Sequence, residues 1–332
     1  MDVEHEARIF ASNLEKIRRE IAKSIVGQNA ILEGVLAALF TGGHVLLEGL
    51  PGLGKTRLVK ALASALELDF ARVQCTPDLM PADIIGTQIL GTPQAGLTNG
   101  RAFEFQRGPV FCNLLLVDEI NRATPKTQSA LLQAMQESAV TVGNATYELP
   151  QPHIVLATQN PIELEGTYPL PEAQLDRFML KLLVQPAELA ELVAILELTT
   201  AGAAVKTQKV LERSAILSSR ELIAAVPAAP NVVEFAARLA LATDPRSKDA
   251  PASVRANVRY GSSPRGAQAL LLAAKYFALA AGRFNAALDD VKKAALPALR
   301  HRIILNFEGD AAGISTDRIV EEIVAHVGGA RA

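Results

Sequence analysis

Apolar and polar residues alternate along the first half of the chain in blocks that predict strands and helices in turn. The short apolar runs that predict buried strands lie at 44–48, 71–75, 111–117 and 153–158. The intervening segments with apolar residues at helical spacing are 56–66 and 126–138. Strands that alternate with helices predict an α/β fold, in which a parallel sheet binds ligands at the carboxyl ends of its strands.

Two segments interrupt this alternation. In residues 140–149 the apolar period changes to two, and Gly143-Asn144 supplies a turn, so we expect a β-hairpin. Residues 86–108 are rich in glycine and contain few periodic apolar positions. We therefore expect an irregular insertion there that protrudes from the core.

The second half of the chain has a different pattern. After about residue 184 it becomes rich in alanine and leucine, with prolines between the helical segments. The segments with helical spacing are 188–199, 231–243, 264–281 and 288–301. We predict an α/β core at 1–184 and a smaller all-helical domain at 185–332, with a long loop at 243–261.

Composition limits the classes of protein to consider. A chain of 332 residues suggests about two domains, and its 49% hydrophobic residues can fill their cores. The formal net charge is −2, aromatic residues make up 5%, and tryptophan is absent, so we expect no nucleic-acid partner. The two cysteines form no disulfide framework, the N-terminus lacks an apolar signal sequence, and the apolar runs are too short to insert into a membrane. We therefore predict a cytoplasmic protein.

The first candidate binding motif is a glycine-rich segment after the first predicted strand. Residues 49–56, GLPGLGKT, match the P-loop pattern G-x-x-x-x-G-K-[ST]. Glycines let the loop turn its amide N–H groups toward phosphates, and the helix that follows directs its positive end at the same anion. Lys55 would contact the β- and γ-phosphates and Thr56 would ligate Mg²⁺. A glycine-rich turn without function is the alternative, but the position between strand and helix argues against it.

A pair of acidic residues follows the third predicted strand. Asp118 and Glu119 come after four apolar residues, in LLLVDE. At the end of a strand beside the P-loop, Asp118 can hold Mg²⁺ through water, and Glu119 can activate the attacking water as a general base. Alone, the pattern could equally be a strand ending in solvated acids, but the upstream P-loop favours the catalytic interpretation.

The sequence alone does not decide the roles of three polar residues. Asn160 ends the next strand, where it could bind the γ-phosphate or position water, yet Asn-Pro is also an ordinary turn. Arg177 follows a predicted short helix after Pro171, and Arg265 begins a helix of the second domain. Arginine stabilises charge on a transferring phosphoryl group, but spacing alone does not separate either residue from a solvated surface arginine.

Together these segments closely resemble the AAA+ superfamily, and within it the MoxR ATPases, from about Ile25 to the end of the chain. The most specific segments are 49–56, 103–110 (FEFQRGPV), 116–123 (LVDEINRA), 157–161 (ATQNP) and 167–178 (TYPLPEAQLDRF). The resemblance implies an AAA+ core followed by a helical lid. It also implies that residues 86–108 are the helix-2 insert and 140–149 the hairpin before the sensor strand.

The resemblance also implies roles for single residues. Asn160 matches the sensor asparagine, Arg177 the arginine finger that acts on the neighbouring subunit's ATP, and Arg265 the lid arginine that contacts the same subunit's γ-phosphate. The expected ATP-binding residues are Val26, Gly27, Gln28, Gly49, Pro51, Gly52, Leu53, Gly54, Lys55, Thr56 and Arg57. Gln74, a weaker candidate, could restrain Glu119, and Arg122 could lie at a subunit boundary.

The resemblance implies a homo-oligomeric ring, expected to be a hexamer, that uses Mg·ATP to remodel a client protein. In this family the client is often a protein with a von Willebrand factor A domain. Two alternatives remain. A DNA-remodelling motor would share the ATPase core but would need a basic DNA-binding surface. A nucleotide-sensing scaffold would bind ATP without turnover, and it would have no need of Glu119 as a base.

Overall fold

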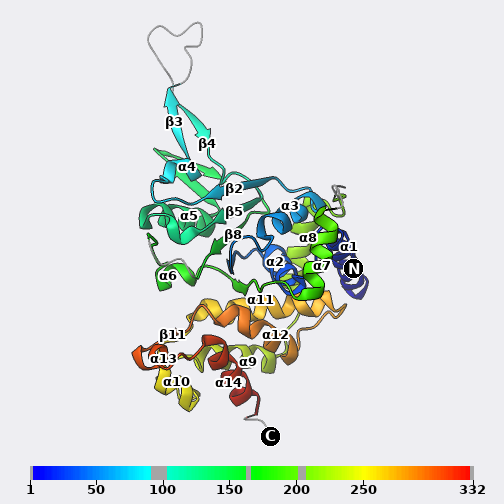
Figure 1. Cartoon of the computed structure of the whole chain (residues 1–332). Coiled ribbons are helices and arrows are strands. Elements are labelled where there is room, and N and C mark those ends of the chain that lie inside the picture. The colour runs from blue at the N-terminus through cyan, green and yellow to red at the C-terminus, as the bar shows by residue number, and fades with distance from the viewer. Residues whose placement is uncertain (1–2, 91–102, 162–165, 201–206, 330–332) are drawn as a thin grey trace.

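The computed structural model describes residues 3–90, 103–161, 166–200 and 207–329. Among these residues, five parallel strands form the central sheet in the order β2-β5-β8-β1-β9 (Figure 1). The strands are β1 (Val45–Glu48), β2 (Phe70–Gln74), β5 (Leu114–Asp118), β8 (Ile154–Gln159) and β9 (Leu180–Leu183). Because all neighbours pair in parallel, their carboxyl ends meet at one edge. The predicted α/β fold with a parallel sheet is confirmed.

Alternate residues of the central strands enter two separate hydrophobic cores, because successive side chains of a strand point to opposite faces. Leu114 and Leu116 of β5 join one core, whereas Leu115 and Val117 join the other. Helices α2 (Asn29–Thr41) and α3 (Lys55–Ala65) cover the first face, and α5 (Pro125–Glu137) covers the second (Figure 1). Both faces of the sheet are therefore buried at its centre, which explains why β5 and β8 are almost entirely apolar.

Two antiparallel hairpins extend from this core. β6 (Ala139–Val142) and β7 (Ala145–Glu148) confirm the hairpin predicted at 140–149, with Gly143 at φ +61° in the turn. β3 (Gly86–Leu90) pairs with β4 (Phe103–Arg107) and projects from the domain, as expected of an insertion (Figure 1). This part is a regular hairpin rather than the irregular segment expected. Residues 91–102 of the predicted insertion lie outside the described residues.

The second half is mainly helical. Its helices are α7 (Leu189–Thr200), α8 (Arg213–Ala225), α9 (Pro230–Leu241), α10 (Ala252–Asn257), α11 (Pro264–Ala280), α12 (Leu288–Leu299), α13 (Phe307–Ala311) and α14 (Thr316–Gly329). The expectation of a long loop at 243–261 is wrong at its carboxyl end, because α10 and β10 (Val258–Tyr260) occupy it. β10 pairs antiparallel with β11 (Ile304–Leu305), so this half is not entirely helical. A strand stabilised by a partner beyond α12 cannot be recognised from its local pattern.

The two halves pack against each other through a shared core. Phe10 of α1 (Val3–Ala22), Phe40 of α2 and Tyr276 of α11 are buried, with ring centroids 5.3 Å apart for Phe10 and Phe40 and 6.4 Å apart for Phe40 and Tyr276. The helix α1 itself was not predicted from the sequence. The division into 1–184 and 185–332 stays a prediction, since this core spans both parts.

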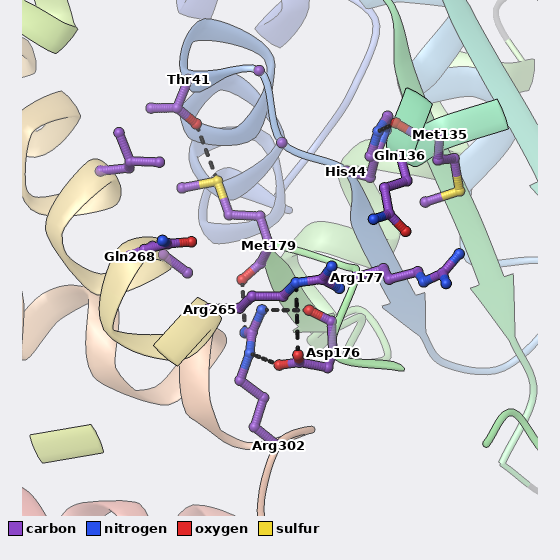
Figure 2. Close-up of a pocket in the computed structure, with 14 residues that line it drawn as sticks. Thr41, His44, Met135, Gln136, Asp176, Arg177, Met179, Arg265, Gln268 and Arg302 are labelled. Atoms are coloured by element: carbon purple, nitrogen blue, oxygen red, sulfur yellow. Dashed lines mark hydrogen bonds and ion pairs between the residues drawn. The ribbon is translucent and has the colours of Figure 1, made fainter. Parts of the chain in front are cut away.

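A buried ion pair joins the second half to the segment just before β9. Arg302 is 2% exposed, and its Nε lies 2.9 Å from Asp176 Oδ1 (Figure 2). The same guanidinium donates to the carbonyl oxygen of Phe178 at 2.8 Å, and Ser263 donates to Asp176 Oδ2 at 2.8 Å. Burial lowers the pKa of Arg302, and the Asp176 carboxylate opposes this shift. Asp176 is therefore held from two positions of the second half.

The features used to predict a cytoplasmic location are consistent with the fold but do not test it. Cys75 and Cys112 are buried and unpaired, and burial raises the pKa of each thiol to about 12. Both therefore remain protonated thiols near neutral pH. Across the residues that the structure describes, no helix has the length and apolar character needed to span a bilayer. The location stays a prediction.

We expect Arg302→Ala to reduce the free energy of unfolding by about 3–5 kcal/mol, because it leaves the Asp176 carboxylate without its buried partner. Urea unfolding followed by circular dichroism would measure the change. Arg246→Ala is the matched control, since Arg246 also pairs with an aspartate but its side chain is 86% exposed. A loss for Arg302→Ala no larger than for Arg246→Ala would contradict a structural role for the buried pair.

Candidate functional site

A loop between β1 and α3 forms the centre of the candidate site. Gly52 and Gly54 have φ values of +83° and +77°, a region that side chains with a Cβ rarely adopt. At Gly49 a Cβ would lie 2.7 Å from the carbonyl oxygen of Val184, so only glycine permits the close approach to the segment after β9. The glycines of the predicted P-loop are thus required by the backbone. They place the start of α3 at the carboxyl edge of the sheet.

Lys55 lies across the mouth of this loop. Its Nζ donates to the carbonyl oxygen of Gly49 at 2.7 Å. Burial lowers the pKa of Lys55, whereas the nearby carboxylates of Asp118, Glu119 and Glu48 oppose that shift. A lysine in this position can move its charge from a carbonyl to a phosphate oxygen with little rearrangement.

The predicted acidic pair faces the loop from the end of β5. Asp118 is buried: its Oδ1 accepts from Thr158 Oγ1 at 3.2 Å and its Oδ2 lies 2.7 Å from Arg72 Nε. Glu119 has a φ of +57°, and its backbone N–H donates to Thr158 Oγ1 at 2.9 Å. A left-handed backbone at a residue other than glycine is a form of strain that recurs at functional sites. Here it directs consecutive carboxylates at the same cavity.

One cavity of about 360 Å³ collects these groups at the carboxyl edge. Its lining residues are Gly49, Pro51, Gly52, Leu53, Gly54, Lys55, Thr56, Arg57, Arg72, Gln74, Asp118, Glu119, Thr158 and Asn160. The structure therefore brings the predicted P-loop, the acidic pair and Asn160 together.

Sequence reasoning missed two residues of this cavity. Thr158 supports both acidic residues, and Arg72 pairs with Asp118. Gln74, a weaker candidate on the sequence, donates from Nε2 to Glu119 Oε2 at 2.9 Å. The signal that could have found Arg72 is its spacing from Gln74, because residues two apart on a strand share a face.

A second cavity, of about 780 Å³, adjoins the first and shares Gly52, Leu53, Gly54 and Arg57 with it. Val26 and Gln28 line it, and a Cβ built on the adjacent Gly27 would contact the Glu191 side chain of α7. Gln28 Nε2 donates to the carbonyl oxygen of Leu53. Its Oε1 is buried and has no hydrogen-bond partner among the described residues. This cavity has the size and polar groups to accept an adenine base, with Gln28 Oε1 as an acceptor for an amino group.

Arg177 and Arg265 lie elsewhere. Both line a third cavity, of about 400 Å³, together with Gly43, His44 and Asp176 (Figure 2). Arg265 Nε is 4.0 Å from Asp176 Oδ2, and Figure 2 shows the Arg177 side chain extending away from that carboxylate. Arg177 Nε is buried and has no partner within the described part of the chain.

The third cavity is at the amino edge of the sheet, which corrects the expectation for Arg265. Gly43 precedes β1 and Gly49 follows it, and six residues at about 3.3 Å each separate the two by about 20 Å. An arginine side chain cannot extend that far, so Arg265 does not reach the P-loop of its own subunit in this structure. Sequence position alone could not show which edge of the sheet the second half would cover.

Mg²⁺ fits the residues of the first cavity. Thr56 and Asp118, the predicted ligands, both line it. Mg²⁺ takes few protein ligands and keeps several waters or phosphate oxygens. In keeping with this, the described residues contain no group of three or more histidine, cysteine or acidic side chains that could bind a metal alone.

Comparisons with known families agree with this geometry. Residues 44–180 match the family described as "ATPase family associated with various cellular activities (AAA)". Residues 251–323 match the family described as "AAA lid domain". The first match covers strands β1, β2, β5 and β8 with the first cavity, and the second covers about half of the helical second half.

Similar proteins extend the match to almost the whole chain. Chaperone MoxR1 of Mycobacterium tuberculosis is 39% identical over 318 residues, which are 95% of this chain and 81% of that protein. Uncharacterized protein YeaC of Bacillus subtilis is 40% identical over 315 residues, which are 95% of this chain and 94% of that protein. A crystal structure of a candidate ATPase from Cytophaga hutchinsonii has a TM-score of 0.89 and 40% identity, and it covers 97% of this chain and 96% of its own.

We expect Lys55→Ala to weaken binding of an ATP analogue by about tenfold to hundredfold, because it removes a charge-assisted hydrogen bond to phosphate. Fluorescence titration with a mant-labelled ATP analogue would measure the affinity. Lys60→Ala, an exposed change on the same helix, is the control and should bind like wild type. Equal affinity for Lys55→Ala and Lys60→Ala would show that the first cavity does not hold the phosphates.

Proposed function

The chain belongs to the MoxR family of AAA+ ATPases, and from this premise we propose that it hydrolyses Mg·ATP between adjacent subunits of a ring. The protein is an ATPase, and its family assembles into oligomers that act on client proteins in a chaperone-like manner. The observation that carries the finer proposal is the separation of two sets of residues. Phosphate-binding and acidic groups line the cavity at the carboxyl edge, whereas Arg177 and Arg265 share a cavity at the amino edge.

In this proposal, ATP occupies the two adjoining cavities. Amide groups at 52–55 and the first turn of α3 bind the phosphates with Lys55. The base lies in the larger cavity, where Gln28 Oε1 accepts a hydrogen bond from its amino group. Thr56 and Asp118 would hold Mg²⁺, which would supply positive charge to the phosphate oxygens.

Glu119 acts as the general base. Its carboxylate accepts a proton from the water that attacks the γ-phosphate, and Asn160 holds that water or a γ-phosphate oxygen by a hydrogen bond. The hydrogen bond from Gln74 and the ion pair with Arg122, whose Nε is 3.3 Å from Glu119 Oε2, restrain the carboxylate before reaction. The base therefore has to leave these partners to reach the water.

Arg177 and Arg265 complete the site of the neighbouring subunit. They lie at the edge of the sheet opposite their own P-loop, so a phosphate that they contact belongs to another chain. Two guanidinium groups stabilise the charge that develops on the transferring phosphoryl group. This assignment replaces the expected contact of Arg265 with its own subunit's ATP.

We further propose a homo-hexamer that remodels a client protein, and a client with a von Willebrand factor A domain is what the family resemblance implies. The family resemblance and the chaperone name of the Mycobacterium relative support this. The projecting β3–β4 hairpin also exposes Ile89, Leu90 and Phe103 by 41%, 57% and 67%. Apolar side chains on a projection suit contact with another protein.

We expect Glu119→Gln to reduce the ATPase rate by about 10²–10⁴-fold, because glutamine cannot accept the proton from water. Binding of the mant-labelled analogue should persist within a few-fold. A phosphate-release assay and the fluorescence titration would measure the two quantities on the same preparation. Glu321→Gln, an exposed change on α14, is the control. Turnover retained in Glu119→Gln would remove Glu119 from the role of base and favour another acceptor.

We expect mixtures of inactive variants to regain activity. Arg177→Ala should lower the rate by about 10³–10⁵-fold, and Lys55→Ala should be nearly inactive, because it binds ATP weakly and lacks the lysine that contacts the γ-phosphate. In a mixed ring, an Arg177→Ala subunit still binds ATP, and a neighbouring Lys55→Ala subunit supplies the intact Arg177 to that ATP. Phosphate release from co-refolded or subunit-exchanged mixtures would measure the recovery.

The same mixture tests which subunit Arg265 serves. If Arg265 acts on a neighbour, Arg265→Ala mixed with Lys55→Ala should also regain activity. If Arg265 acts on its own subunit's ATP, that mixture stays inactive while the Arg177→Ala mixture recovers. Failure of both mixtures, with subunit exchange verified by native mass spectrometry, would contradict catalysis between subunits.

A further inference from the structure

A row of polar contacts connects β2 to the acidic pair at the end of β5. Arg72 Nε lies 2.7 Å from Asp118 Oδ2, and Arg72 Nη2 donates to Gln74 Oε1 at 3.1 Å. Gln74 Nε2 in turn donates to Glu119 Oε2 at 2.9 Å. The register of the two strands, with Gln74 opposite Asp118, places these side chains side by side. One arginine thus contacts the proposed Mg²⁺ ligand and also the glutamine that restrains the proposed base.

The orientation of the Gln74 amide follows from its two partners. A guanidinium group only donates hydrogen bonds, and a carboxylate only accepts them. Arg72 therefore requires the amide oxygen, and Glu119 requires the amide nitrogen. If Arg72 moved away, the amide oxygen would lose its charged donor, and nothing else among these contacts would fix the amide toward Glu119.

Arg72 and a metal ion at Asp118 compete for the same carboxylate. Asp118 Oδ1 already accepts from Thr158, and Oδ2 is paired with Arg72. A divalent cation bound at Asp118 would bring a second positive group next to the guanidinium in a partly enclosed cavity, where repulsion between like charges is stronger than in water. The Arg72 side chain is 48% exposed, so it has room to swing away from Oδ2.

We propose that Arg72 is a positioning residue that couples metal binding at Asp118 to the release of Glu119, an inference that rests on the proposed Mg·ATP chemistry. While Arg72 pairs with Asp118, it orients Gln74 to hold Glu119. With a divalent cation at Asp118, Arg72 would move away and Gln74 would lose its fixed orientation. Glu119 would then keep only the ion pair with Arg122 and could turn toward water more easily. When ATP binds without a metal, Gln74 would therefore still restrain Glu119.

The test is a magnesium titration that does not depend on turnover. In the Glu119→Gln background, the affinity for the mant-labelled ATP analogue is measured against Mg²⁺ concentration. Arg72→Gln removes the competing charge, so we expect the Mg²⁺ concentration for half-maximal tightening to fall about two- to tenfold. Arg72→Lys keeps a charge without the contact to Gln74, and its value should lie between those of wild type and Arg72→Gln. Arg213→Gln breaks an arginine–aspartate pair outside the cavity and should leave the titration unchanged.

A half-saturating Mg²⁺ concentration in Arg72→Gln equal to or above that of the parent would overturn the competition. The link to Gln74 is tested in the protein that keeps Glu119, with Arg72→Gln, Gln74→Ala and the double variant. The shifts in half-saturating Mg²⁺ concentration caused by the two single changes should not add up to the shift of the double variant. Additive shifts would overturn the coupling. The proposed function fails separately, if the unmodified protein shows no Mg²⁺-dependent binding of the analogue. Arg72→Gln and Arg72→Lys are both exposed-side-chain changes, and circular dichroism would verify that each is folded.

Discussion

Parallel pairing of the strands is the constraint on which the rest of the structure depends. It gathers the P-loop, the acidic pair and Asn160 at one edge, because each follows the carboxyl end of a strand. The same pairing sends the segment before β9, with Arg177, to the other edge. A fold of this kind separates the cavity of the P-loop from Arg177 and Arg265 of the same chain by the length of a strand. Assembly into an oligomer is the direct way to bring the two edges together.

Sequence patterns predicted those parts of the fold that depend on residues close together in the chain. The P-loop depends on glycines in left-handed conformations, and the buried strands are apolar on both faces, so both leave a clear record in the sequence. The start of β5 was misplaced at Phe111, because Asn113 belongs to the loop, where it accepts from Asp69 N at 3.1 Å and donates to the carbonyl oxygen of Pro152 at 2.8 Å. Such long-range hydrogen bonds have no local signature.

The candidate site was predicted where its residues belong to a contiguous motif and missed where they do not. Lys55, Asp118 and Glu119 stand in recognisable runs, whereas Arg72 looks like any half-exposed arginine of a strand. Its partner Asp118 lies 46 residues away in the sequence. Arg265 was assigned to the wrong edge for a related reason, since the packing of α11 on α1 and α2 is a tertiary outcome.

The hydrogen bonds of Asp176 give the second half of the chain a direct hold on Arg177. Ser263 and Arg302 both bind that carboxylate, and Arg177 is its immediate neighbour in the chain. A rotation of the second half would therefore be transmitted through Asp176 to Arg177 and would move it. Linkage makes the effect reciprocal: a neighbour's nucleotide that favours one position of Arg177 also favours one position of this lid. In the proposed ring, subunits coupled in this way would not hydrolyse ATP independently of one another.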